Sequence, residues 1–258
     1  MSNLKDFQII VDNFKDRVED VKKLLILDEL IIGNTIEVLE ERQQNLLNCG
    51  IENAHMLGVN ALQQLRGIRD HESLKPGYKL IHNQCVVLLV SYFSSSMHDL
   101  FDTAATKILK SGIPKKLKGK DFKLTLEELK SYDFDLSSSI GSIISRKFDI
   151  SFQDMASISR AMKDYFGAEL PWDKTVNNII TMQACRHAIA HAGEIADKQL
   201  LNQLRNSSER DIQKNIKEGS KVQFTPDEIK LGGDEMVKYI VNLTSKITRN
   251  NRGQTTIN

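Results

Sequence analysis

The hydrophobic residues of this chain recur mainly at intervals of three and four, the spacing that places them on one face of an α-helix. Residues 4–32 carry one broad apolar stripe of this kind. The Gly-Asn pair at residues 33–34 interrupts it, and a second helical pattern follows over residues 36–68, with weak points at Cys49-Gly50 and Gly58. Together the two patterns predict a helical hairpin at the N-terminus.

The next long pattern, over residues 80–109, is apolar on nearly all sides. A helix of this type has to be surrounded by other elements, so we expect it at the centre of a bundle. Residues 71–78, which include Pro76-Gly77, are the best candidate for a linker before this helix. Gly112 and Pro114 are expected to end it.

The second half of the chain is predicted to form shorter helices separated by polar segments. Helical periodicity is present over residues 124–130, 152–166, 173–191 and 235–247. Irregular chain is expected around Ser137-Ser-Ser139 and Gly141, and a turn at Gly232-Gly233. The resulting prediction is an all-α fold, with an N-terminal helical hairpin over residues 1–75, a helical domain over residues 76–248 and a disordered tail over residues 249–258.

The charge balance and the cysteines limit the cellular compartment and the partners expected for this protein. With 35 Lys and Arg against 34 Asp and Glu, the net charge of +1 produces no global attraction to nucleic acid or to a membrane. The three cysteines are widely spread and odd in number, which rules out a disulfide scaffold and favours a reducing compartment, and they lack the C-x-x-C spacing of metal or redox sites. The N-terminus lacks the apolar core of a signal peptide, and the most apolar run, residues 85–93, is too short to span a bilayer. We therefore expect a cytoplasmic protein without a membrane partner.

Candidate chemistry is concentrated at the end of the helix expected over residues 173–191. Asp173 is a plausible N-cap, and Gly193 is well placed to end the helix in a left-handed conformation. The last turn carries Arg186, His187 and His191 among small residues. At about 100° per residue the two histidines share one face, roughly 40° apart, and the long Arg186 side chain can reach the same edge.

This cluster suits phosphoryl transfer. A histidine can take up or release a proton near neutral pH, and a permanently charged guanidinium stabilises the anionic transition state of a phosphate reaction. Two other interpretations stay open at this point. A histidine on a helix is commonly a structural polar residue, and two histidines at i and i+4 can bind zinc, although the glutamate of an H-E-x-x-H site is missing here.

The segment Arg186-His187-Ala188-Ile189-Ala190-His191-Ala192-Gly193 resembles the R-(N/D/H)-x-x-x-H signature of the HEPN superfamily, in particular its RiboL-PSP-like branch. The order of the surrounding elements is similar as well: an early apolar helix, a variable insert, a short helix, the motif helix and a tail. The resemblance covers residues 80–247. It implies a HEPN-type helical bundle, with the N-terminal hairpin as an extension outside it.

The resemblance also implies an activity, that of a metal-independent endoribonuclease whose site lies at the interface of a homodimer. In such enzymes the ribose 2′-OH attacks the neighbouring phosphorus and leaves a 2′,3′-cyclic phosphate. By this resemblance His191 is the general base or acid, Arg186 stabilises the transition state, and His187 positions the phosphate or assists proton transfer. The expected partner is RNA, in the setting of a toxin or an anti-phage defence effector, with a possible antitoxin or regulatory protein.

Family members often carry an acidic residue on the early helix, facing the motif. The comparable stretch here reads Tyr92-Phe-Ser-Ser-Ser-Met-His-Asp99, so Ser94, Ser95, His98 and Asp99 are the candidates for that position. No cofactor is expected, since no P-loop, G-x-S-x-G or H-E-x-x-H motif is present.

Two further features bear on RNA binding. A lysine run between Lys107 and Lys123 forms either an RNA-docking surface or a solvated loop. Trp172, next to Pro171, is expected to be a packing residue at the start of a helix. The alternative function, from another class, is a catalytically silent helical module whose N-terminal hairpin recruits a partner protein.

Overall fold

Helices form almost all of the secondary structure in the computed structural model, which describes residues 2–51, 59–70, 75–111, 115–121, 123–205, 207 and 209–254. They are α1 (Ser2–Leu24), α2 (Leu27–Asn48), α3 (Val59–Asp70), α4 (Lys75–Ser111), the 3₁₀-helix η3 (Lys115–Leu117), α5 (Leu126–Ser131), α6 (Leu136–Lys147), α7 (Met155–Phe166), α8 (Lys174–His191), α9 (Lys198–Leu204) and α10 (Pro226–Gln254). The described residues contain only an isolated bridge between Ile195 and Lys221 as β-structure. The predicted all-α class is confirmed.

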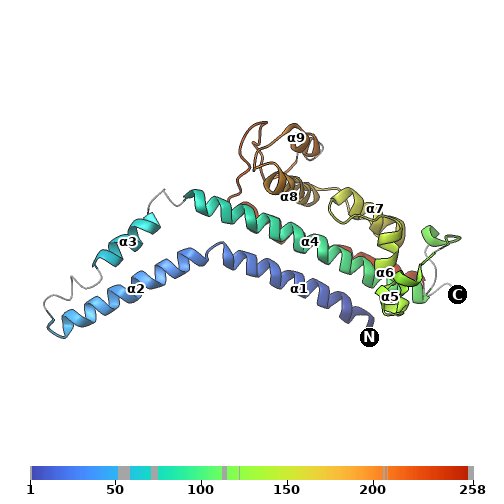
Figure 1. Ribbon diagram of the computed structural model, residues 1–258, viewed down its shortest axis with the longest axis horizontal. Helices are drawn as coiled ribbons and strands as arrows, with labels where there is room; N and C mark the ends of the chain where they lie inside the picture. Colours follow the sequence, from blue (N-terminus) through green and yellow to red (C-terminus); the bar gives the residue numbers. More distant parts are fainter. Residues whose placement is uncertain are drawn as a thin grey trace.

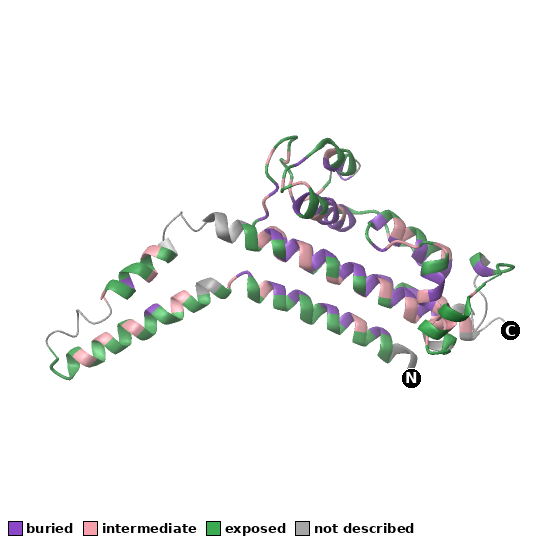
Figure 2. Cartoon of the chain, in the orientation of Figure 1, coloured by how far each residue is buried: buried purple, intermediate pink, exposed green. Residues whose placement is uncertain are grey.

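The central element is α4, which packs against α1, α6, α7, α8 and α10 (Figure 1). Its aromatic and aliphatic side chains are buried along most of its length, and Phe93, Met97 and Phe101 have no exposed surface (Figure 2). The apolar character on nearly all sides is thus explained by neighbours on several sides. The linker expected before this helix is shorter than proposed, because α4 begins at Lys75 with Pro76 in its first turn, where proline is tolerated; residues 71–74 lie outside the described residues.

The first helix belongs to the main body of the molecule. Its apolar face is buried against α4 and α10, and Phe14 lies edge-on to Phe93, with ring centroids 6.1 Å apart. The predicted hairpin over residues 1–75 instead separates this helix from the body. The first break is predicted at residues 33–34, whereas it occurs at residues 25–26 and α2 continues through Gly33. A glycine inside a long helix costs only about 1 kcal/mol relative to alanine, which such a helix can tolerate.

Beyond this break, α2 and α3 pack on each other and project from the body as an arm (Figure 1). Gly50 follows α2 with a φ of 77°, in agreement with the weak point expected there. Most apolar side chains of α2 are exposed, and only Ile36 is fully buried (Figure 2). The helical hairpin of this region is therefore formed by α2 and α3, and Gly58 lies outside the described residues.

Two glycine-containing segments expected to be irregular are helical. Gly141 lies within α6 and the Gly232-Gly233 pair within α10. A Cβ on Gly141 would collide with the backbone of Asp102 on α4, and one on Gly232 would collide with the side chain of Met182 on α8. These glycines thus permit close helix packing, a tertiary requirement that local turn signals do not reveal.

The C-terminal helix is longer than predicted at both ends. It begins at Pro226 and is capped by Thr225 in a capping box. The backbone N–H of Thr225 donates to the Glu228 carboxylate, and the backbone N–H of Glu228 donates to the Thr225 hydroxyl. It ends at Gln254, so residues 249–254, expected to be disordered, are helical; residues 255–258 lie outside the described residues. Within the described part of the chain, no helix combines the length and apolarity needed to cross a bilayer.

Candidate functional site

The helix that carries the motif is set by clear local signals. Asp173 accepts a hydrogen bond from the backbone N–H of Val176 at 3.1 Å, which confirms the predicted N-cap. At the other end Ala192 is the C-cap and Gly193 follows with a φ of 61°, the left-handed conformation expected there. The last turn of α8 is consequently held at a defined position, with His191 as its final residue.

The motif side chains are gathered at this end of α8. His187 and His191 are both exposed, and their ring centroids lie 5.0 Å apart, as the i, i+4 spacing predicts. Arg186 is partly buried, and its Nε is enclosed without a hydrogen-bond partner. Among the described residues no carboxylate forms an ion pair with Arg186; Glu194, eight positions later in the chain, pairs with Lys221. The positive charge of Arg186 therefore has no carboxylate partner among the described residues.

Two cavities meet at Arg186. The first, of about 590 Å³, is called here the serine–histidine cavity, and its lining comprises Ser91, Ser94, Ser95, His98, Asp149, Ile150, Ser151, Phe152, Gln153 and Arg186. The second, of about 870 Å³, is called the tryptophan cavity, and its lining comprises Gln153, Asp154, Met155, Ala156, Trp172, Ile180, Gln183, Ala184, Arg186, His187, Gln203 and Ser207. Arg186 and Gln153 are the residues that these two linings share.

The serine–histidine cavity narrows the choice among the polar residues of α4 that the sequence left open. Ser94, Ser95 and His98 line it together with Arg186, whereas Asp99 does not belong to the lining. The hydroxyl of Ser94 is buried and has no hydrogen-bond partner. Asp99 instead lies behind the imidazole, with its Oδ1 3.9 Å from Nδ1 of His98.

The surroundings of His98 favour its charged form. The interaction with Asp99 raises the pKa of the imidazole, partial burial opposes this shift, and the negative charge of Asp102 adds to it. Nε2 lies 3.5 Å from the hydroxyl of Ser145 on α6, and the ring packs edge-on against Phe152, with centroids 5.4 Å apart. His98 is thus a positioned, titratable side chain in the same cavity as Arg186.

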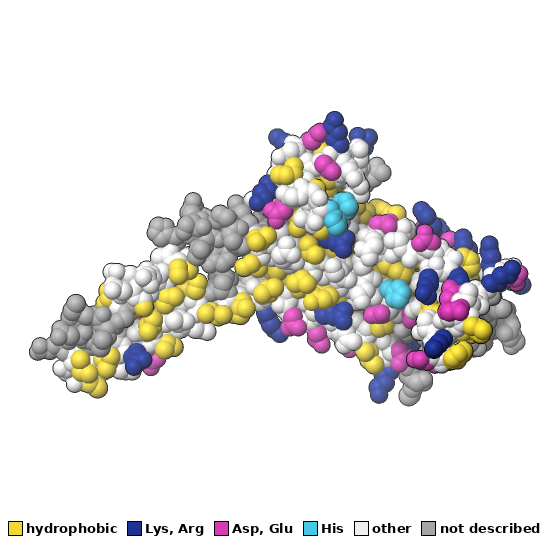
Figure 3. Space-filling model, viewed as in Figure 1, with side chains coloured by type: hydrophobic (Ala, Val, Ile, Leu, Met, Phe, Trp, Pro, Cys, Tyr) yellow, Lys and Arg dark blue, Asp and Glu magenta, His cyan; other side chains and the backbone are white. Residues whose placement is uncertain are grey.

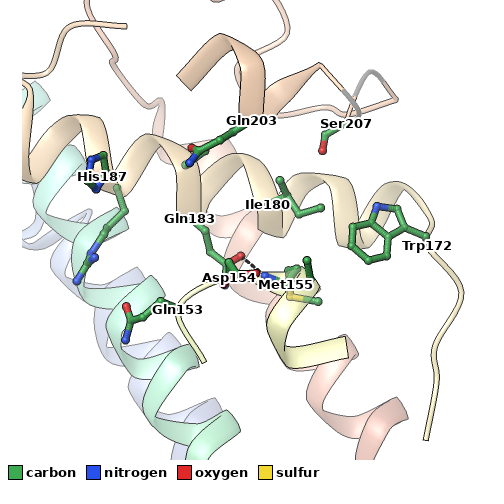
Figure 4. A pocket seen from close by; sticks show the side chains of 12 residues that line it. Gln153, Asp154, Met155, Trp172, Ile180, Gln183, His187, Gln203 and Ser207 are labelled. Atoms are coloured by element: carbon green, nitrogen blue, oxygen red, sulfur yellow. Dashed lines mark hydrogen bonds between the residues drawn. The ribbon is translucent and has the colours of Figure 1, made fainter. Parts of the chain in front are cut away.

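The tryptophan cavity extends along α8 and is bordered by the start of α7 and by α9 (Figure 4). Trp172 lies near the N-terminal end of α8, with 53% of its surface exposed, and His187 lies toward the opposite end (Figure 4). The expectation that Trp172 is a packing residue is therefore wrong. Sequence reasoning also missed Gln153, Gln183 and Gln203, because nothing in their local pattern shows that three separate segments converge.

Two lysines of the run form ion pairs within the fold. Lys107 pairs with Asp6 at 2.8 Å and covers the ring of Phe7, and Lys116 pairs with Asp164 at 2.9 Å. Lys118, Lys120 and Lys123 are exposed, and the side chains of Lys110 and Lys115 lie outside the described residues. No lysine of the run lines either cavity. The described lysines of the run therefore lie outside both cavity linings.

Metal and thiol chemistry find little support in the described residues. No group of three or more His, Cys, Asp or Glu side chains gathers there, so the His187–His191 pair has no third protein ligand for zinc. Burial raises the pKa of Cys85 to about 11 and that of Cys185 to about 12, which keeps both thiols protonated at neutral pH. Arg186 and the histidines remain the candidate chemical groups of this site.

Comparison of the chain with protein-family models, with curated proteins and with solved structures gives no significant match. The function is therefore inferred from the side chains that surround the two cavities.

Proposed function

We propose that this chain is a metal-independent endoribonuclease of the HEPN type, which cleaves RNA by attack of a ribose 2′-OH on the adjacent phosphate. The supporting observation is the unpaired charge of Arg186, next to the exposed His187 and His191 and in one cavity with His98. A site with a fixed cation and several imidazoles contains the groups that this reaction needs: one to remove a proton, one to supply a proton, and one to stabilise negative charge.

In the proposed reaction the 2′-oxygen forms a bond to phosphorus while the bond from phosphorus to the 5′-oxygen breaks. One imidazole accepts the proton of the 2′-OH, and a protonated group donates a proton to the departing 5′-oxygen. Arg186 stabilises the negative charge on the non-bridging oxygens. His191 acts as base or acid, and His187 positions the phosphate or assists the transfer. The products are a 2′,3′-cyclic phosphate and a 5′-OH, so no metal or water enters the step.

His98 is the residue of α4 that we assign to the same site. Because Asp99 and Asp102 raise its pKa, it retains a proton at a pH where an ordinary histidine has lost it. Such a group suits the role of general acid toward the 5′-oxygen. The serines beside it, Ser94 and Ser95, can donate hydrogen bonds to phosphate oxygens.

We also propose a homodimer in which two copies of the end of α8 face one another, so that each site uses motif residues of both protomers. The exposure of His187, Ala190 and His191 in the single chain supports this arrangement, because that face is open to a second copy. The proposed setting is cytoplasmic, as a toxin or anti-phage effector with an antitoxin or regulatory protein as a possible partner.

One observation favours the alternative function of a catalytically silent interaction module. The arm formed by α2 and α3 exposes a set of large apolar side chains, and Figure 3 shows hydrophobic residues along it and onto the adjoining body. On α2 these residues are Leu27, Leu30, Ile31, Val38 and Leu47. A face of this kind is typical of a surface that binds another protein.

Incubation of purified full-length protein with total RNA in EDTA tests the proposal. The wild type should produce fragments with cyclic-phosphate ends, and Arg186→Ala and His191→Ala should not. Matched controls are Arg160→Ala and His82→Ala, whose side chains line neither cavity, and which should cleave like the wild type. Intact RNA with the wild-type dimer, or undiminished cleavage by both motif variants, would contradict the proposal.

A further inference from the structure

The tryptophan cavity has the size of a ligand site, and the proposed cleavage reaction does not use most of it. Its volume of about 870 Å³ lies within the range of about 300 to 1,000 Å³ that small-molecule sites occupy. Only Arg186 and His187 of its lining belong to the motif. The remainder comes from the start of α7, the length of α8, and α9 with Ser207, so the fold builds it from three separate segments.

One end of this cavity is an aromatic platform. Trp172 is the single tryptophan of the chain, and with 53% of its surface exposed it leaves its large indole ring accessible to a ligand. The neighbouring lining residue Ile180 supplies apolar surface on the same side of α8 (Figure 4). An indole ring beside an open cavity is suited to stacking on a nucleobase, which every base allows because each has a π-face.

The middle of the cavity contains an amide with an unused donor. Gln183 is more than nine-tenths buried, and its Oε1 accepts a hydrogen bond from the backbone N–H of Met155 at 3.0 Å, which fixes its orientation. Its Nε2 has no hydrogen-bond partner. A buried donor without a partner is unfavourable, and an acceptor on a bound ligand would satisfy it. Gln203 on α9 adds an exposed amide opposite (Figure 4), and amides both donate to and accept from base edges.

The other end of the cavity is cationic, with Arg186 and His187. Asp154 is the one carboxylate in the lining, and its Oδ1 accepts a hydrogen bond from the N–H of Ser157 as the N-cap of α7. Between Asp173 and Arg186 the chain advances roughly 20 Å along the axis of α8, at 1.5 Å per residue. A single nucleotide cannot extend over that length, whereas a strand of several nucleotides can.

From this arrangement we propose that the tryptophan cavity binds a segment of single-stranded RNA, with one base stacked on Trp172, a second base at the Gln183 amide, and the backbone phosphate at Arg186. The identity of the strand rests on the proposed ribonuclease function. The cavity then sets substrate affinity and base preference at positions removed from the cleaved bond, while the motif performs the chemistry.

Because Trp172 is the only tryptophan, its fluorescence reports on this cavity alone. We would titrate the wild-type protein with 2′-O-methyl oligonucleotides of one to about six residues, which bind but lack the attacking 2′-OH. We expect saturable quenching, with an affinity that increases at least about tenfold from the mononucleotide to the longest oligonucleotide. Absence of quenching would overturn the proposal, and equal affinity for the mononucleotide would overturn its assignment to a strand.

Variants separate stacking from a structural effect. With a labelled oligonucleotide and fluorescence anisotropy, Trp172→Ala should weaken binding about tenfold or more, and Trp172→Phe should retain most of the affinity. Gln203→Ala should change the preference among the four homopolymers. Phe134→Ala, at another exposed aromatic residue outside the cavity, is the matched control and should bind like the wild type. Equal binding by Trp172→Ala and the control would overturn the proposal.

The outcomes also distinguish this inference from the proposed function. If RNA quenches the fluorescence of Trp172 but the protein does not cleave RNA, the proposed ribonuclease function is refuted and the proposed binding site is retained. Cleavage with an unchanged KM in Trp172→Ala, without quenching in the wild type, would remove the binding site and leave the ribonuclease.

Discussion

The two cavities that meet at Arg186 offer a substrate different groups. The serine–histidine cavity provides serine hydroxyls and the imidazole of His98, whose pKa is raised by Asp99 and Asp102. The tryptophan cavity provides an aromatic ring, amides and aliphatic surface. His187 is the motif histidine in its lining. Groups of the first kind transfer protons and stabilise charge, and groups of the second kind bind and discriminate.

This difference predicts that the cavities on the two sides of Arg186 have different roles. Groups that act only in the transition state change kcat, whereas groups that hold the substrate equally before and during reaction change KM. Residues of the serine–histidine cavity should therefore act on kcat, and residues of the tryptophan cavity outside the motif should act on KM. Arg186, which lines both, should act on both parameters.

The largest effect is expected from Arg186→Ala. Loss of a charged group that stabilises a transition-state oxyanion lowers the rate by about 10²–10³-fold, and KM should rise as well because the tryptophan cavity loses its phosphate contact. Steady-state cleavage of a short fluorogenic RNA measures both parameters. Arg186→Lys should recover only part of the loss, since a lysine is a point charge without a planar fork of donors. Full recovery by lysine would show that charge alone matters there.

A smaller effect, of about 10²-fold and confined to kcat, is expected from His98→Gln, because the variant keeps a polar side chain but cannot donate a proton as an acid. The same fluorogenic assay gives kcat and KM for this variant and for Trp172→Ala, which should raise KM alone. Thermal unfolding checks that the contact of His98 with Phe152 does not alter the fold. An increase in KM without a loss of kcat in His98→Gln would break the division between the cavities.

The combination of these two substitutions sharpens the comparison further. Independent sites give additive free energies within about 0.3–0.5 kcal/mol, which corresponds to about twofold in rate. The loss of kcat/KM in the double variant His98→Gln/Trp172→Ala should therefore equal the product of the single losses within about twofold. A double variant whose kcat/KM is no lower than that of the less active single variant would show that both cavities serve one step.

Local signals were sufficient to predict the motif helix. The cap at Asp173, the spacing of His187 and His191, and the left-handed Gly193 all depend on residues within one or two turns, and the structure agrees with each. The choice of His98 over Asp99 could not be made from sequence, because both lie on α4 and only the packing of that helix decides which one faces Arg186.

The failures of the sequence analysis have a common physical origin in tertiary packing. The Gly232-Gly233 pair predicts a turn, but Gly232 lies inside α10, at a position where Met182 leaves no room for a side chain. The stripes of α1 and α2 look similar in sequence, yet α1 is buried in the main core and α2 projects from it. Trp172 is exposed because three segments distant in sequence leave a cavity beside it.

The smallest predicted effect concerns stability against pH, and it also separates the two cavities. Because Asp99 and Asp102 raise the pKa of His98 in the folded state above its value of about 6.5 in the unfolded chain, protonation of His98 stabilises the fold. This contribution is complete below the unfolded pKa and is lost as the pH rises through the folded pKa. His98→Gln should therefore reduce the free energy of unfolding more at about pH 5 than at about pH 9.

Urea denaturation of the wild type and of His98→Gln at the two pH values measures this difference. Trp172→Ala is the matched control from the other cavity, and its effect on the free energy of unfolding should be the same at both pH values, because an indole carries no titrating proton. An equal loss at both pH values in His98→Gln would mean that the carboxylates do not hold a proton on this imidazole, and the assignment of His98 as general acid would fail with it.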